Sequence, residues 1–90
     1  MFTLYQPDGG IYGVGDTIEA AKADALEWLE GGMNEADQAE LLGTNDRESG
    51  DKLYIRECTD RLAAAIREES GTVIFDVNDD GLLDLVEVID

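Results

Sequence analysis

The chain has 90 residues, of which 22 are acidic and six are basic, and it contains no histidine, so its net charge is −16 at pH 7. Such a charge repels nucleic acid and anionic lipid and attracts proteins with a basic working surface. It argues against direct nucleic-acid binding, and the lack of histidine excludes the usual histidine-containing zinc sites.

The composition predicts a single domain over residues 1–90. Apolar residues make up 43% of the chain, which is enough for one core, and they occur in periodic blocks that disordered acidic chains lack. The single cysteine, Cys58, excludes an intrachain disulfide. The first residues show neither a basic leader nor a long apolar run. We therefore expect a monomer of the cytoplasm that makes no contact with a membrane.

The first part of the chain predicts a β-hairpin followed by a long helix. Residues 2–6 and 11–15 are β-prone runs on either side of a Pro-Asp-Gly-Gly turn. Asp16, with Glu19 three residues later, is typical of a helix N-cap, and the Ala-rich helix should continue to Glu30, before two glycines. The apolar stripe expected to face the core consists of Ile18, Ala21, Ala25, Trp28 and Leu29.

The middle of the chain predicts a short helix, a loop and a strand. Residues 34–42 can form a helix with Asn34 as its cap. Residues 43–51 have the composition of a solvated loop. Residues 52–58 alternate in character, which is typical of a strand with two different faces.

The last part predicts a helix and a second hairpin. Thr59 is a suitable cap for a helix over residues 60–70, whose buried stripe is Leu62, Ala63 and Ile66. Residues 72–77 and 82–89 are rich in Val, Ile and Leu, and the Asn-Asp-Asp-Gly between them is a hairpin turn signal. The whole order is ββα(α)βαββ, an α+β domain with helices on one face of a mostly antiparallel sheet of about five strands.

The acidic residues are unevenly distributed. Residues 16–51 sum to −9 and residues 76–90 to −6, whereas residues 52–75 sum to zero. Only clustered carboxylates can imitate DNA, which carries one charge per about 1.7 Å of axis. On the predicted helix Glu27 and Glu30 lie about one 5.4 Å turn apart. The candidate phosphate surrogates are Asp16, Glu19, Asp24, Glu27, Glu30, Glu35, Asp37 and Glu40.

In length, charge and absence of active-site groups, the chain resembles the small acidic inhibitors of phages and mobile elements, the anti-CRISPR and anti-restriction proteins. This resemblance is one of profile and carries over no functional residue. It implies an inhibitor that occupies the DNA site of a basic nucleic-acid-binding protein, such as a defence complex, in the cytoplasm of the host cell. Association would be fast and salt-sensitive.

Two plainer interpretations of the acidity stay open. The carboxylates can be a solvated surface adapted for solubility or for a high-salt cell. The chain can also be an acidic adaptor or antitoxin-like partner that binds one basic protein without resembling DNA.

Residues 76–87 match the twelve-residue calcium-loop pattern, with Gly81 at the bend. The oxygen ligands would be Asp76, Asn78, Asp80, Asp84 and Glu87. The segment resembles an EF-hand loop, and also the strand-flanked calcium loops of β-propeller repeats. An EF-hand needs a helix on either side, whereas this segment follows a β-branched run. The sequence therefore favours a plain hairpin without a metal, with a calcium-binding module as the alternative.

No catalytic motif is apparent, and we expect neither enzymatic activity nor a cofactor. Cys58 lacks a histidine base and should face the core from a strand. The glycines around residues 9–15 lack the Lys-Ser/Thr of a phosphate loop. The aromatic residues are expected in the core rather than on a base-stacking platform; they are Phe2, Tyr5, Tyr12, Trp28, Tyr54 and Phe75.

Overall fold

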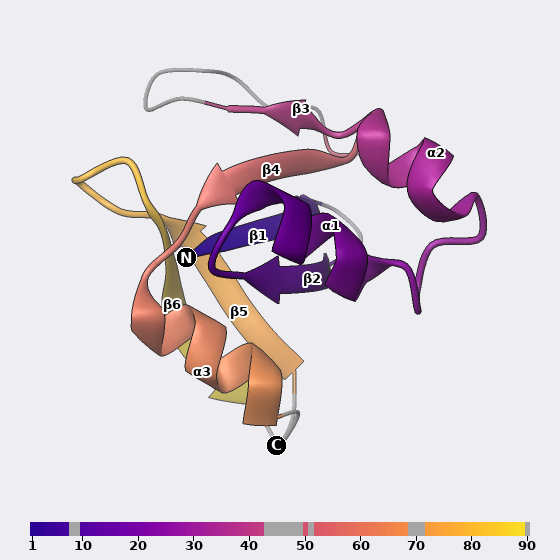
Figure 1. Cartoon of the computed structure of the whole chain (residues 1–90). Helices are drawn as coiled ribbons and strands as arrows, with labels where there is room; N and C mark the ends of the chain where they lie inside the picture. Colours follow the sequence, from indigo (N-terminus) through magenta and orange to yellow (C-terminus); the bar gives the residue numbers. More distant parts are fainter. Residues whose placement is uncertain (8–9, 43–49, 51, 69–71, 90) are drawn as a thin grey trace.

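The structure is a computed structural model that describes residues 1–7, 10–42, 50, 52–68 and 72–89. Its strands are β1 (Phe2–Gln6), β2 (Gly10–Gly15), β3 (Glu40–Leu41), β4 (Tyr54–Glu57), β5 (Thr72–Val77) and β6 (Leu83–Ile89). Its helices are α1 (Ile18–Ala25), α2 (Gly32–Asp37) and α3 (Asp60–Glu68). Figure 1 shows their arrangement. The predicted α+β class is confirmed.

The strands form two sheets rather than one. A four-stranded sheet has the order β2-β1-β4-β3, in which β3 runs parallel to β4 and the other pairs are antiparallel. The final hairpin, β5 and β6, makes a separate two-stranded antiparallel sheet. The prediction of one sheet of about five strands is therefore wrong, because the final hairpin packs against a face of the first sheet instead of extending its edge.

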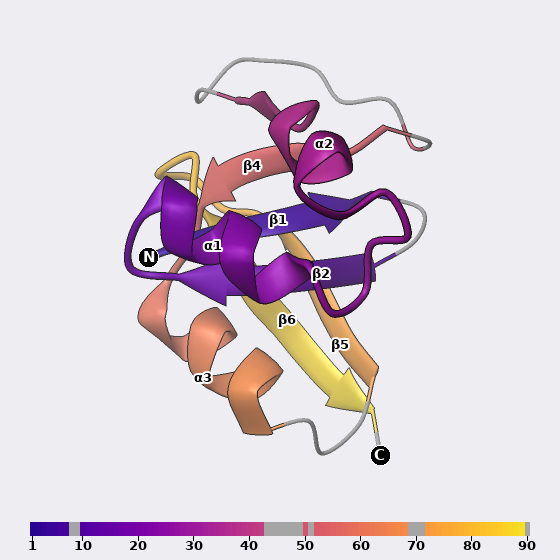
Figure 2. The same cartoon turned by 45° about the vertical axis from the view of Figure 1, so that its right-hand side comes forward.

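Both faces of the four-stranded sheet are covered (Figure 2). On one face, Leu4 and Ile55 pack with residues of α1, α2 and their connection. On the other face, Tyr5 and Tyr54 pack in one cluster with residues of α3 and β6. Successive side chains of the interior strands β1 and β4 point to opposite faces of the sheet, and both faces are buried. The prediction that the helices share one face is wrong, since α3 lies opposite α1 and α2.

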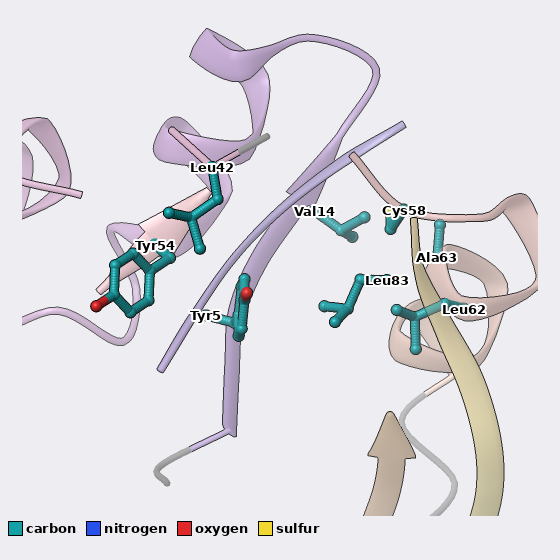
Figure 3. Packing of buried hydrophobic residues seen from close by; sticks show 8 residues of the cluster. All are labelled: Tyr5, Val14, Leu42, Tyr54, Cys58, Leu62, Ala63 and Leu83. Atoms are coloured by element: carbon teal, nitrogen blue, oxygen red, sulfur yellow. The ribbon is translucent and has the colours of Figure 1, made fainter. Parts of the chain in front are cut away.

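Aromatic contacts hold the final hairpin against the sheet. The Tyr5 ring lies edge-on to Phe75 of β5, with ring centroids 5.7 Å apart, and 6.3 Å from the ring of Tyr54. Figure 3 shows Tyr5, Tyr54 and Leu83 in the same cluster. The Tyr5 hydroxyl also accepts a hydrogen bond of 3.2 Å from Nε of the buried Arg56. The Tyr5–Phe75 contact joins the second sheet to the first, and the contacts of Tyr5 with Tyr54 and Arg56 fix the Tyr5 ring in position for it.

Helix α1 approaches β2 unusually closely. A Cβ atom placed on Gly13 would lie 2.4 Å from the carbonyl oxygen of Ala21 and 2.6 Å from the amide nitrogen of Ala25. Both alanines are fully buried. Gly13 therefore belongs to a helix–strand contact in which only backbone and methyl groups fit.

The predicted continuation of this helix to Glu30 is wrong. The helix ends at Ala25, and the chain continues through tighter turns, with the Trp28 amide donating to the Ala25 carbonyl at 3.0 Å. This change of direction buries Leu29 and leaves Trp28 64% exposed, so the prediction that Trp28 lies in the core is also wrong. The space between α1 and β2 admits alanine but not an indole ring. The N-cap is Thr17, whose Oγ1 accepts from the Ala20 amide, and not Asp16.

The predicted helix over residues 34–42 is replaced by α2 and β3. Leu42 donates its amide to the Ile55 carbonyl at 2.9 Å, and Glu40 donates to the Leu53 carbonyl at 3.2 Å. Pairing with β4 therefore outweighs local helix propensity here. Most of the loop predicted for 43–51 lies outside the described residues.

The helix capped by Thr59 is confirmed as α3, because Thr59 Oγ1 accepts from the Leu62 amide at 3.3 Å. Its predicted end at residue 70 lies outside the described part of the chain. In the part of the chain that the structure describes, no helix is long and apolar enough to cross a bilayer.

Candidate functional site

All eight carboxylates predicted as partner contacts lie in one segment, whose helices cover one face of the four-stranded sheet and whose end forms the edge strand β3. We define the acidic layer as residues 16–41, which comprise α1, α2, their connection and β3. This layer carries eight carboxylates and one lysine, a net charge of −7. In Figure 2 its helices α1 and α2 lie on the near side of the sheet.

Three of the eight carboxylates are used within the fold. Asp24 Oδ2 accepts the Val14 amide at 3.0 Å, which ties α1 to the outer edge of β2. Glu35 Oε2 accepts the Gly31 amide at 2.9 Å. Asp37 Oδ1 forms an ion pair with Lys22 at 3.2 Å, joining α1 to α2. These three side chains position the layer as well as adding charge to it.

The other five carboxylates are exposed and make no hydrogen bond or ion pair within the described residues. They are Asp16, Glu19, Glu27, Glu30 and Glu40. The predicted spacing of Glu27 and Glu30 on one helix is wrong, because both follow the end of α1 at Ala25. Their oxygens are available to a partner, but they follow the path of a turn rather than a helical row.

Unpaired carboxylates in this layer should make stability depend on salt. Raising NaCl from about 0.01 M to about 0.15 M shortens the Debye length from about 30 Å to about 8 Å. We expect the melting temperature to rise by several degrees, because screening weakens the mutual repulsion of the carboxylates. Thermal unfolding followed by circular dichroism measures this. A flat or falling curve would mean that ion pairs already neutralise the layer.

A second group of carboxylates lies on the final hairpin, across the sheet from the acidic layer. Asp76, Asp79, Asp80 and Glu87 are exposed there. Among the described residues, exposed carboxylates therefore occur on the final hairpin as well as in the acidic layer.

Asp84 of this hairpin differs from the others because it is fully engaged. Arg61 of α3 binds both of its carboxylate oxygens, with Nε to Oδ1 at 2.7 Å and Nη2 to Oδ2 at 2.8 Å. The Thr59 hydroxyl donates to Oδ1 at 2.7 Å, and Asn78 Nδ2 lies 3.4 Å from Oδ2. The Arg61 guanidinium, with the Thr59 hydroxyl, holds the pKa of the Asp84 carboxyl well below its usual value.

The calcium-like segment is organised as a hairpin turn. Asn78 Oδ1 accepts the amides of Asp80 and Leu82 at 2.9 and 3.1 Å, and Gly81 has a φ of 80°. Both Asp84 oxygens already accept hydrogen bonds from Arg61 and one also accepts from the Thr59 hydroxyl, so they are engaged within the fold rather than free to ligate a metal. Among the described residues no three acidic or cysteine side chains are gathered closely enough to hold a metal ion. The geometry favours the hairpin over the calcium loop.

Replacing Asp84 by asparagine should destabilise the protein in a pH-dependent way. A carboxyl whose pKa is depressed by folding contributes stability above its ordinary pKa, near 3.8, and loses that contribution as the pH falls below it. We expect Asp84→Asn to lower the melting temperature at pH 7, and the difference from the native chain to shrink below about pH 4. Thermal melts across the acid range measure this.

The matched control is Asp79→Asn, which removes the same charge from an exposed turn position without a partner in the described residues. It should change the melting temperature little. A difference between Asp84→Asn and the native chain that persists unchanged at strongly acid pH would contradict the ion-pair argument.

Cys58 is confirmed as a core residue. It is buried beside Leu62, Ala63 and Leu83 (Figure 3). Burial raises the pKa of its thiol to about 11. The thiolate is therefore scarce at neutral pH, and this side chain is a poor nucleophile.

An open cleft of about 670 Å³ adjoins the acidic layer. One wall is formed by Asp24, Glu27 and Trp28, and the others come from β2, the end of α3 and the start of β5. Sequence reasoning did not place Trp28 at a surface, because helical periodicity assigned it to the buried stripe. The only signal that could have found it was the run of small residues before it, which permits the close packing that excludes an indole.

Comparison of the chain with protein families, with curated proteins and with solved structures finds no match.

Proposed function

We propose that this protein is a non-enzymatic inhibitor that blocks a DNA-binding protein, a recognition subunit of a defence complex such as a CRISPR effector, by presenting the acidic layer in place of DNA. The observation that carries the proposal is a set of five exposed carboxylates in one layer that have no hydrogen-bond or ion-pair partner among the described residues: Asp16, Glu19, Glu27, Glu30 and Glu40.

Concentration of charge is what the proposal requires. The accessible surface is 5494 Å², so an even spread of 22 carboxylates would give each about 250 Å², a spacing of about 16 Å that cannot follow a phosphate backbone. The acidic layer departs from an even spread in net charge, since its 26 residues carry −7, whereas an even share of the −16 over 90 residues would be about −5. Its one lysine, Lys22, is already paired with Asp37.

The fold supports a rigid presentation of these groups. The layer is fixed to the sheet by Ala25, Leu29 and Ala36 in a shared core cluster. It is also fixed by the hydrogen bond from the Val14 amide to Asp24. A preorganised anionic surface loses little conformational entropy on binding, and its field accelerates association with a basic groove.

Competition with DNA tests the proposal. Purified CRISPR effector complexes of several types are each loaded with a fluorescent target duplex, and the chain is added while anisotropy reports release of the DNA. We expect release from one type of effector, in a salt-sensitive manner. If the chain releases DNA from none of these effectors, the proposed inhibition of a CRISPR effector by DNA mimicry is contradicted. Binding to an effector that keeps its DNA would instead identify an acidic adaptor.

A further inference from the structure

The cleft beside the acidic layer has two unlike walls. Asp24, Glu27 and Trp28 form an acidic and aromatic wall, whereas α3 contributes Ile66 and Arg67 from the other side. Its volume of about 670 Å³ falls within the usual range for ligand sites. It is large enough for one long side chain together with the backbone that carries it.

Trp28 is an unusual residue to leave in solvent. It is the single tryptophan of the chain and is 64% exposed, although burial of an indole is strongly favourable. Tryptophan is among the residues most enriched where binding energy concentrates in protein interfaces. An indole face next to two carboxylates attracts a cation through both its quadrupole and their charge.

The chemistry of the walls selects the kind of cation. A planar guanidinium stacks on an indole and offers several N–H donors to carboxylates, whereas an ammonium group does so less well. Arg67 is the one basic residue among the described residues that line the cleft. Its N–H donors suit the backbone carbonyls of a polypeptide that enters the cleft. Its positive charge favours a position of the incoming guanidinium at the opposite, acidic wall rather than beside α3.

We propose that this cleft binds one arginine side chain of a basic partner protein, with the guanidinium on Trp28 and between Asp24 and Glu27. The assignment rests on the proposed function, since the arginine would belong to the same DNA-binding protein that faces the acidic layer. The bound arginine would fix the position of the partner at one border of the acidic layer, whose other contacts are electrostatic and less specific in position.

A capped tetra-arginine peptide tests the site directly, because the fluorescence of the single tryptophan reports on the cleft. We expect a saturable change in Trp28 emission at low salt. By calorimetry, Trp28→Ala should weaken tetra-arginine binding by about fivefold or more, and a tetra-lysine peptide should bind the native chain several-fold more weakly. The matched control is Leu41→Ala, which truncates another exposed apolar side chain outside the cleft and should leave the affinity unchanged.

A second pair of variants removes one charge inside or outside the cleft without truncating the indole. Glu27→Gln should weaken binding of the peptide more than Glu19→Gln, although both change the net charge from −16 to −15. Equal effects of the two, or binding without any change in Trp28 emission, would overturn the assignment by placing the peptide elsewhere on the acidic layer. That result leaves DNA release from the effector untouched, so failure of the cleft and failure of the inhibitor function are distinguishable.

Discussion

Replacement of Gly13 by alanine is expected to lower the free energy of unfolding by about 3 kcal/mol, at the upper end of the usual overpacking cost. The added Cβ would lie 2.4 Å from the Ala21 carbonyl oxygen and 2.6 Å from the Ala25 amide nitrogen. These are backbone atoms of α1 that no rotamer change can move, so the whole helix must shift away from β2. For a domain of this size the melting temperature should fall by about 12–24 °C.

The control is Gly32→Ala, which separates steric from conformational effects. A Cβ on Gly32 would meet no atom within 4 Å, but its φ of 60° disfavours any other residue. That substitution should cost about 1 kcal/mol. Urea unfolding of both variants measures the two costs. If Gly13→Ala proves no more destabilising than Gly32→Ala, the close contact between α1 and β2 is wrong.

The elements that the sequence predicts best are those set by local signals. Strands β1 and β5 have the predicted bounds, and α3 begins after Thr59 as expected. In each case the residues that define the element are adjacent in the chain: a β-prone run beside a turn, or a hydroxyl three residues before the amide that it caps.

The errors occur where distant contacts decide the outcome. Helix α1 stops at Ala25 because its small residues lie so close to β2 that Trp28 cannot follow on the same face. Strand β3 forms because β4 offers an edge to pair with, although Glu40 and Leu41 continue a helical pattern. The final hairpin joins the core through Phe75 and Tyr5, a contact between residues 70 positions apart.

The candidate site shows the same division. Charge counting selected the eight carboxylates of the acidic layer, since their number is a property of the sequence itself, and their role as a contact face stays a prediction. It did not distinguish Asp24, whose oxygen is bound by the Val14 amide, from Glu27, whose oxygens are exposed. The cleft beside Trp28 depends on where α1 ends, and that is fixed by the packing of the helix against β2.

The position of the charges, and not only their number, should decide inhibition. Glu19→Gln, Glu27→Gln and Glu30→Gln together change the net charge from −16 to −13 and alter exposed side chains of the acidic layer alone. We expect about 10- to 100-fold more of this variant to be needed for release of half of the DNA from the effector, because close charge pairs across an interface are lost.

The matched triple variant combines Asp79→Asn, Asp80→Asn and Glu87→Gln, which give the same net charge from exposed positions of the final hairpin. At about 0.15 M salt the Debye length is about 8 Å, so the charges of the final hairpin are screened from a partner that occupies the acidic layer. This variant should need only about twofold more protein. Equal losses in the two variants would show that bulk charge suffices, and a larger loss in the hairpin variant would put the contact face on β5 and β6. Either result would contradict DNA mimicry by the acidic layer. A loss confined to the first variant would instead indicate that the basic groove of the partner contacts α1 and the turn that follows it.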